Sequence, residues 1–165
     1  MKIVVQLAVA AAALAAGLWL WTTIFPSPQH VIRARLNEMA RDASFNSSQG
    51  PQEGYAAAQT VGNFFSTNVE ITLNAPGSPG RTLTGRDQII QTLIGVHESV
   101  TRLEVDFPDL NVTVGPDQDS ATADLTFRAQ VDGTRDSIAE EMKVTLKKIG
   151  GQWLVTHIET VPVLT

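Results

Sequence analysis

The spacing of apolar residues changes twice along this chain, and each spacing predicts a different kind of structure. From Ile3 to Phe25 the chain carries no charged residue. A helix rises about 1.5 Å per residue, so roughly 20 residues cross a ~30 Å hydrocarbon core, and this segment is long enough. From His30 to Phe45, apolar residues recur at helical spacing. After Thr101, apolar and polar residues alternate, which is typical of half-buried strands.

The first 25 residues fit a transmembrane anchor best. Trp19, Trp21 and Phe25 close the segment, and amphipathic indole rings favour the interface between membrane and water. A cleaved signal peptide is the second interpretation, because Ala13-Leu14-Ala15 matches a small-residue cleavage pattern, although cleavage there would leave an exposed apolar tail. A buried helix is the third, but a segment that is apolar on every side suits lipid better.

We therefore expect an anchor over residues 1–27 and one domain over residues 28–165, which makes the chain a single-pass membrane protein. Membrane lipid, bound through residues 3–25, is then its first partner. Lys2 favours a cytoplasmic amino terminus, whereas the arginines after the segment, taken alone, favour the opposite topology. Long domains translocate largely regardless of charge, so we expect the domain on the extracytoplasmic, periplasmic side.

The pattern of the domain predicts helices first and strands afterwards. The expected elements of its first half are helices over residues 30–45, 55–65 and 84–97, and strands over residues 69–73 and 81–84. Thr84, with Asp87 three residues later, resembles a capping box at the start of the third helix. Four strands joined by tight turns follow, and the last of them, from Trp153, is apolar on both faces.

One irregularity is expected at Pro108-Asp109. The apolar set before it includes Val105 and Phe107, and the set after it begins at Leu110, which shifts the alternation by one residue. A one-residue slip would turn the apolar face outward, and a β-bulge at this point would restore it. Helices segregated from an antiparallel sheet in this order predict an α+β domain with a curved sheet.

Composition excludes several classes of protein. The chain has no cysteine, which removes disulfides, thiolate zinc sites and cysteine nucleophiles. Its net charge is −5 with both signs mixed, so nucleic acid is not an expected partner. The three histidines are scattered without ligand spacing, so neither a metal site nor a cofactor is expected.

Candidate site residues fall into two groups. The candidates for lining an apolar pocket are Tyr55, Phe64, Phe107, Phe127 and Met142, although such side chains can equally fill a core. His157 and Glu159 share a face of the last strand and could form a base with its orienting acid. The acids of the other strands take the opposite parity from the apolar residues and should face water: Glu104, Asp106, Asp124 and Glu141.

Three local motifs carry a family resemblance. They are FFSTNVEITL (Phe64 to Leu73), LTGRDQIIQTL (Leu83 to Leu93) and KKIGGQWLVTHIETV (Lys147 to Val161). From Pro28 onward the chain resembles the nuclear-transport-factor-2-like superfamily, which includes SnoaL-like polyketide cyclases and ketosteroid isomerases. The resemblance implies a cone-shaped domain whose curved, mixed or antiparallel sheet wraps around three helices and encloses an apolar pocket. It also implies homodimerisation through the sheet.

Two functions follow from these observations. The first is a membrane-tethered, non-enzymatic binding or accessory module that presents its cone to a protein partner, a second copy or a small apolar ligand. Such a module could be a subunit of a larger membrane complex. The alternative is a SnoaL-like isomerase, cyclase or hydratase acting on a hydrophobic molecule through His157, Glu159 and Tyr55. The first is favoured because the inward strand positions are almost all apolar.

Overall fold

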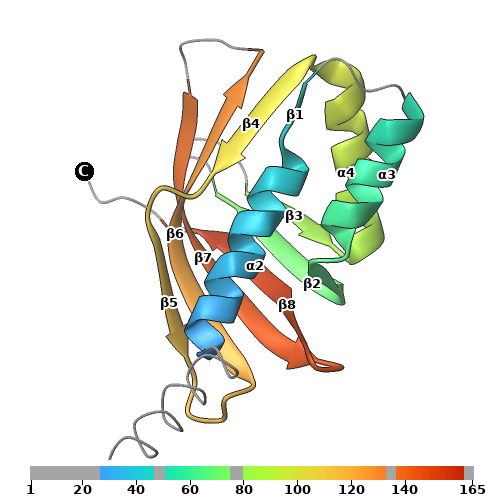
Figure 1. Ribbon diagram of the computed structural model, residues 1–165. Coiled ribbons are helices and arrows are strands. Elements are labelled where there is room, and N and C mark those ends of the chain that lie inside the picture. The colour runs from blue at the N-terminus through green and yellow to red at the C-terminus, as the bar shows by residue number, and fades with distance from the viewer. Residues whose placement is uncertain (1–26, 47–50, 75–79, 133–136, 162–165) are drawn as a thin grey trace, which may run out of the picture.

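The computed structural model describes residues 27–46, 51–74, 80–132 and 137–161 (Figure 1). The segment that carries Trp19, Trp21 and Phe25 therefore lies outside the described residues. Among the helices of the described part, none combines the length and the apolar character that a membrane span requires.

Three helices form in the described chain: α2 (Pro28–Ala43), α3 (Pro51–Gly62) and α4 (Arg86–Ser99). All three were predicted, with shifted ends. The second begins earlier than expected, at Pro51, because proline suits the first turn of a helix. It also ends earlier, so that Phe65 opens a strand instead of closing a helix.

The predicted capping box at the start of α4 is wrong. Gly85 is the N-cap, with φ of 88°, a conformation that glycine adopts without steric cost. Its amide donates to the carbonyl of Val69 at 2.7 Å, which fixes the turn against the sheet. The amide of Thr84 donates to Oε1 of Gln88 at 2.7 Å, so Gln88 makes the bond that the pattern assigned to Asp87.

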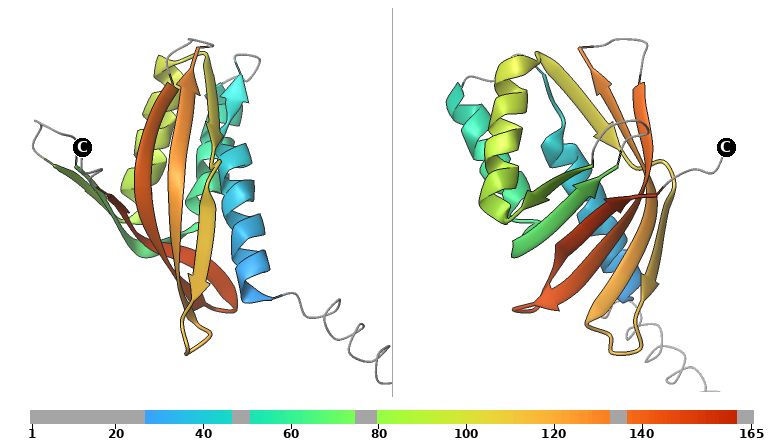
Figure 2. Two further views of the ribbon diagram at one scale, coloured as in Figure 1. Left: turned by 90° about the vertical axis from the view of Figure 1, so that its left-hand side faces the viewer. Right: turned by 180° about the vertical axis from the view of Figure 1, so that it is seen from behind.

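Eight strands make one mixed sheet. They are β1 (Phe45–Asn46), β2 (Phe65–Leu73), β3 (Arg81–Thr84), β4 (Arg102–Asp106), β5 (Leu110–Val114), β6 (Ser120–Val131), β7 (Ser137–Ile149) and β8 (Gln152–Thr160). Their order is β1-β4-β6-β7-β8-β2-β3, with β5 also beside β6. Only the pairing of β2 with β8 is parallel among the described strands. The sheet is curved and does not close into a barrel (Figures 1 and 2).

The predicted bulge at Pro108-Asp109 is confirmed. β4 and β5 pair with successive parts of the long strand β6, with Asp106 opposite Arg128 and Leu110 opposite Leu125. One more residue lies between these pairs on the β4–β5 side than on β6, and the amide of Thr126 donates to Asp109 there at 3.0 Å. The apolar residues on both sides of the break therefore share one face of the sheet.

The core lies between that face and the three helices. One apolar row crosses six paired strands: Val112, Ala123, Val144, Ile158, Ile71 and Leu83. α2 lies across this face, and α3 packs beside α4 at one side of it (Figures 1 and 2). Ile32 and Leu36 of α2 are essentially fully buried against it. We call this the inner face and the opposite side the outer face.

Candidate functional site

The two faces of the sheet differ sharply in chemistry. Directly beside the apolar row, the outer face presents Asn111, Asp124, Lys143, Glu159, Thr72 and Thr82 across the same six strands. The next outer row is Thr113, Thr122, Thr145, His157, Glu70 and Thr84. The outer face is thus polar throughout these rows, and apolar chemistry gathers on the inner face.

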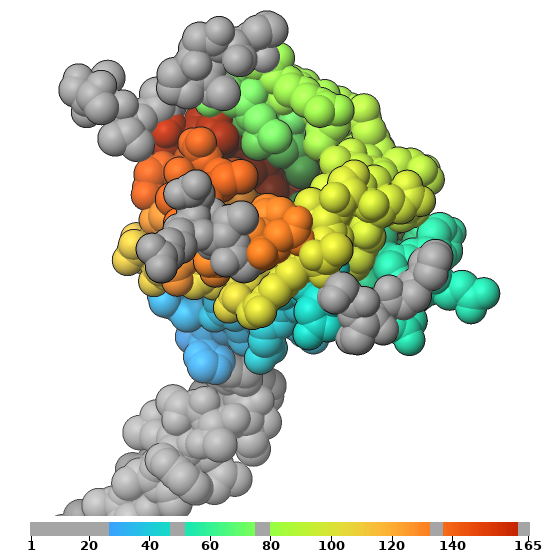
Figure 3. All heavy atoms as spheres, turned by 90° about the horizontal axis from the view of Figure 1, so that it is seen from above, coloured from blue at the N-terminus to red at the C-terminus, as the bar shows by residue number. Residues whose placement is uncertain are grey.

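Half-buried apolar side chains mark the upper boundary of the core. Phe127 of β6, Met142 of β7 and Phe107, which directly follows β4, pack against the core and remain partly exposed. The rings of Phe107 and Phe127 have centroids 6.4 Å apart in a tilted arrangement. Seen from above, the domain is hollowed between the sheet and α4 (Figure 3). We call this hollow the cone mouth, and Phe107, Phe127 and Met142 are its candidate lining residues, because they pack at the edge of the core and remain partly exposed.

Sequence reasoning missed one acid on the inner face of β7. Glu140 pairs with Phe127 across β6 and β7, and its side chain is exposed on the inner face. Ile138, opposite Ala129 on the same face, is 56% exposed. The signal was present, because the alternation that places Met142 and Val144 inward reaches Glu140 when it is extended back by one step.

The other two pocket candidates lie elsewhere. Tyr55 is on the surface of α3, 55% exposed, and its hydroxyl accepts a hydrogen bond from Nε2 of Gln59 at 3.2 Å. Phe64 is 6% exposed within the core, and the guanidinium of Arg35 lies 4.7 Å from its ring centroid. The structure therefore brings together Phe107, Phe127 and Met142, but neither Tyr55 nor Phe64.

The catalytic candidates do not converge. His157 Nε2 lies 3.8 Å from Glu159 Oε2, so these two are neighbours as their parity suggested. Both belong to the outer face, where their side chains are 35% and 46% exposed. Tyr55, on the exposed side of α3, is not part of this pair. A base that acts on a bound substrate needs a site beside it, and the outer face supplies no apolar wall here.

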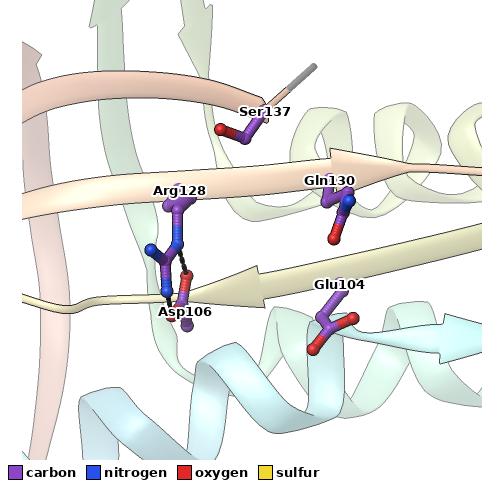
Figure 4. A pocket seen from close by; sticks show the side chains of 5 residues that line it. All are labelled: Glu104, Asp106, Arg128, Gln130 and Ser137. Atoms are coloured by element: carbon purple, nitrogen blue, oxygen red, sulfur yellow. Dashed lines mark hydrogen bonds and ion pairs between the residues drawn. The ribbon is translucent and has the colours of Figure 1, made fainter. Parts of the chain in front are cut away.

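A polar cleft of about 210 Å³ lies on the outer face between β4, β6 and β7 (Figure 4). It is lined by Glu104, Asp106, Arg128, Gln130 and Ser137. Arg128 donates from Nε to Oδ1 of Asp106 at 2.8 Å and from Nη2 to Oδ2, so the guanidinium and the carboxylate form a bidentate ion pair. These hydrogen bonds lower the pKa of Asp106 and raise the pKa of Arg128.

The charged side chains that line the cleft are already paired with other side chains, which leaves little charge to bind a ligand. The charges of Arg128 and Asp106 satisfy each other, and their side chains are about half exposed, so water competes for both. Glu104 pairs with Arg102 at 3.4 Å, also in solvent. Asp106 and Arg128 carry opposite charges, but only the register of β4 on β6 reveals that the two residues face each other.

The described histidines are structural or exposed. His97, in the last turn of α4, stacks on Phe45 of β1 with centroids 3.7 Å apart, and desolvation lowers its pKa. His30 is exposed in the first turn of α2. Within the described ranges, no three histidine, aspartate or glutamate residues cluster in a way that could hold a metal ion.

Comparison with known proteins identifies the fold of the described domain. No protein-family model matches the sequence, and no curated relative matches it. A nuclear-transport-factor-2-like protein with a cystatin-like fold from Novosphingobium aromaticivorans aligns with a TM-score of 0.61 and 20% identity, over 89% of this chain and 86% of that one. A protein from the same organism, provisionally described as a scytalone dehydratase, aligns at 0.59 with 15% identity, over 82% and 83%.

A yeast protein extends the range of functions on this fold. The UBP3-associated protein BRE5 aligns with a TM-score of 0.59 and 14% identity, over 84% of this chain and 100% of that one. At these identities the likeness shows the fold alone. The described domain has the cystatin-like α+β fold of nuclear-transport-factor-2-like and SnoaL-like proteins.

Proposed function

We propose that this chain is a membrane-tethered, non-enzymatic binding module whose cone mouth receives an apolar group, carried by a small molecule or by a partner protein. The observation that carries the proposal is the separation of chemistry between the two faces of the sheet. The inner face is apolar across six strands, and the candidate acid–base residues lie outside it. A half-exposed apolar boundary is suited to binding a hydrophobic group, because burial of that group removes both surfaces from water.

The enzymatic alternative is a SnoaL-like isomerase, cyclase or hydratase, and it finds less support. It required at least two of Tyr55, His157 and Glu159 to meet in one pocket. His157 and Glu159 meet on the outer face, and Tyr55 lies on α3. Glu140 lies on the inner face of β7, but it is exposed, and neither His157 nor Tyr55 lies beside it.

Solved structures of the same fold leave room for both functions. One is described as a dehydratase and another as a protein associated with UBP3. The choice between binding and catalysis for this chain therefore depends on its own residues.

The membrane tether is part of the proposal. Residues 3–25 would anchor the chain, with the domain on the extracytoplasmic side. Because α2 begins at Pro28, its first turn would lie close to the bilayer. The cone mouth lies toward the other end of α2 (Figures 1 and 3), so it would open away from the membrane.

The proposal can be tested by methyl NMR of the full chain in lipid nanodiscs. The chain contains three methionines, of which Met142 borders the cone mouth and Met39, 7% exposed, lies in the core. Titration with a neutral aromatic probe such as indole should shift the Met142 methyl signal to saturation and leave Met39 almost unchanged.

Two variants make this test specific. Phe127→Ala should weaken binding of the probe at least three-fold, because it removes half of the aromatic boundary. His157→Gln, on the outer face, should leave the affinity unchanged. A Met142 signal that does not move, or one that moves together with Met39, would refute the proposed site.

A further inference from the structure

We propose that the tip of the β7–β8 hairpin is a second contact of this domain with the bilayer, in which Ile149 enters the lipid interface beside Lys147 and Lys148. This inference rests on the proposed tether. It concerns how the domain is oriented, and it names the lipid surface as the partner of a part of the chain far from the anchor.

The hairpin and the start of α2 lie at the same end of the domain. In Figures 1 and 2, the first turn of α2, the β5–β6 turn and the β7–β8 turn all lie in the lower part of the domain, with the β7–β8 turn projecting to the side in Figure 1. A hydrogen bond links α2 to the start of β8, because Arg35 Nε, about two turns into the helix, donates to the carbonyl of Trp153 at 2.7 Å. An anchor that ends at Ser27 would therefore bring the hairpin tip towards the membrane surface.

The tip has the composition of an interfacial contact. Ile149 is 46% exposed, although isoleucine is among the residues most often buried. Lys147 and Lys148 precede it and are exposed. Long lysine side chains can lie along apolar surface while the ammonium reaches lipid phosphates, and an aliphatic side chain gains from leaving water.

The turn itself offers nothing that would hold Ile149 away from lipid. Gly150 and Gly151 form the turn with φ of 59° and 80°. No atom lies within 4 Å of where a Cβ would stand on either glycine, so the tip projects into open space. This conformation lets two residues without side chains approach the membrane while the preceding isoleucine points outward.

Opposing charge at the same end limits the electrostatic part of the contact. Asp117 and Asp119 of the β5–β6 turn are exposed. Asp117 is engaged within its turn, where Oδ1 accepts from the hydroxyl of Ser120 at 2.7 Å and from its amide at 3.0 Å. The two acids offset the two lysines, so insertion of Ile149 should dominate and depend only weakly on salt.

The same strand supplies a matched control. Ile138 is also an exposed isoleucine of β7, at the opposite end of the strand. At roughly 3.3 Å per residue, it lies about 36 Å from Ile149 along the strand. A bilayer that contacts the hairpin tip cannot also contact Ile138 in the same orientation.

Single labels can be introduced because the chain has no cysteine. Ile149→Cys and Ile138→Cys variants of the full chain would each carry an environment-sensitive NBD fluorophore. They would be reconstituted in vesicles of phosphatidylcholine and phosphatidylglycerol, with or without nitroxide-labelled lipid. Gln152→Cys gives a third label at the tip that keeps Ile149 in place.

We expect nitroxide lipid to quench the labels at positions 149 and 152 at least two-fold more than the label at position 138. Equal quenching at both ends, in protein that floats with the vesicles, would overturn the hairpin contact and leave the tether standing. Protein that does not float with vesicles would overturn the tether and, with it, this inference.

Discussion

Arg35 provides the most informative perturbation of the fold, because it joins three elements. Its Nε donates to the carbonyl of Trp153 at 2.7 Å, its Nη2 donates to the carbonyl of Asn63 at 3.3 Å, and its guanidinium covers the ring of Phe64. It thereby fastens α2, the helix that follows the N-terminal segment, to the sheet. Replacement by methionine keeps an unbranched apolar side chain and removes the charge and both donors.

The expected loss of unfolding free energy in Arg35→Met follows from these three contacts. A hydrogen bond from a charged donor contributes about 1.5–3 kcal/mol when it is shielded. The second bond is longer and exposed, and a cation–π contact near the surface adds about 0.5–1 kcal/mol. Because the three contacts are not additive, we expect Arg35→Met to lower the free energy of unfolding by about 2–3 kcal/mol. This corresponds to a Tm lower by about 6–12 °C for a domain of this size.

The assay is urea denaturation of the full chain in detergent, followed by far-ultraviolet circular dichroism. Arg33→Met is the matched control, since Arg33 lies on the same helix and is exposed, and it should change stability by no more than about 0.5 kcal/mol. The denaturant slope should not change in either variant. Equal effects of the two substitutions would refute the role assigned to Arg35.

Two further predictions concern α4. Gly85→Ala should destabilise the domain by about 1–2 kcal/mol, because residue 85 has φ of 88°. Gly95→Ala, within the same helix and with open space around the new methyl group, should stabilise it by about 0.5–1 kcal/mol. Thermal unfolding of both variants measures the two changes. His97 has a pKa below its usual 6.5, so folding favours its neutral form. Its contribution to stability should be complete above about pH 6.5 and decrease as the pH falls through that value. His97→Phe, which keeps a ring against Phe45, should flatten this dependence, and an unchanged slope of unfolding free energy between about pH 5 and 7 would contradict the assignment.

Alternation along the chain was sufficient to predict the strands after Thr101 and which of their residues face the core. The shift at Pro108-Asp109 predicted a bulge, because a buried face fixes register and a slip of one residue would expose it. The parity that placed Asp124 and Glu141 outside was correct for the same reason. These features depend on neighbours in sequence or on one period, and both can be read from a single chain.

Contacts between distant segments could not be predicted in this way. Nothing local to Arg35 in the sequence indicates that a carbonyl more than one hundred residues away accepts its hydrogen bond. Asp106 and Arg128 meet only through the register of β4 on β6. Tyr55 and Phe64 looked alike as pocket candidates, yet Tyr55 lies on the surface of α3, and Phe64, which follows the end of that helix, lies in the core.

The central claim is that the inner face of the cone receives an apolar occupant. Two neighbouring residues of β6 allow a direct test. Phe127 and Arg128 are adjacent residues whose side chains lie on the inner and the outer face. The photoreactive residue p-benzoylphenylalanine would replace each in turn, and the full chain would be irradiated in the cells that produce it. We predict a discrete covalent adduct from position 127 and none from position 128. No adduct from position 127, or the same adducts from both positions, would contradict the account.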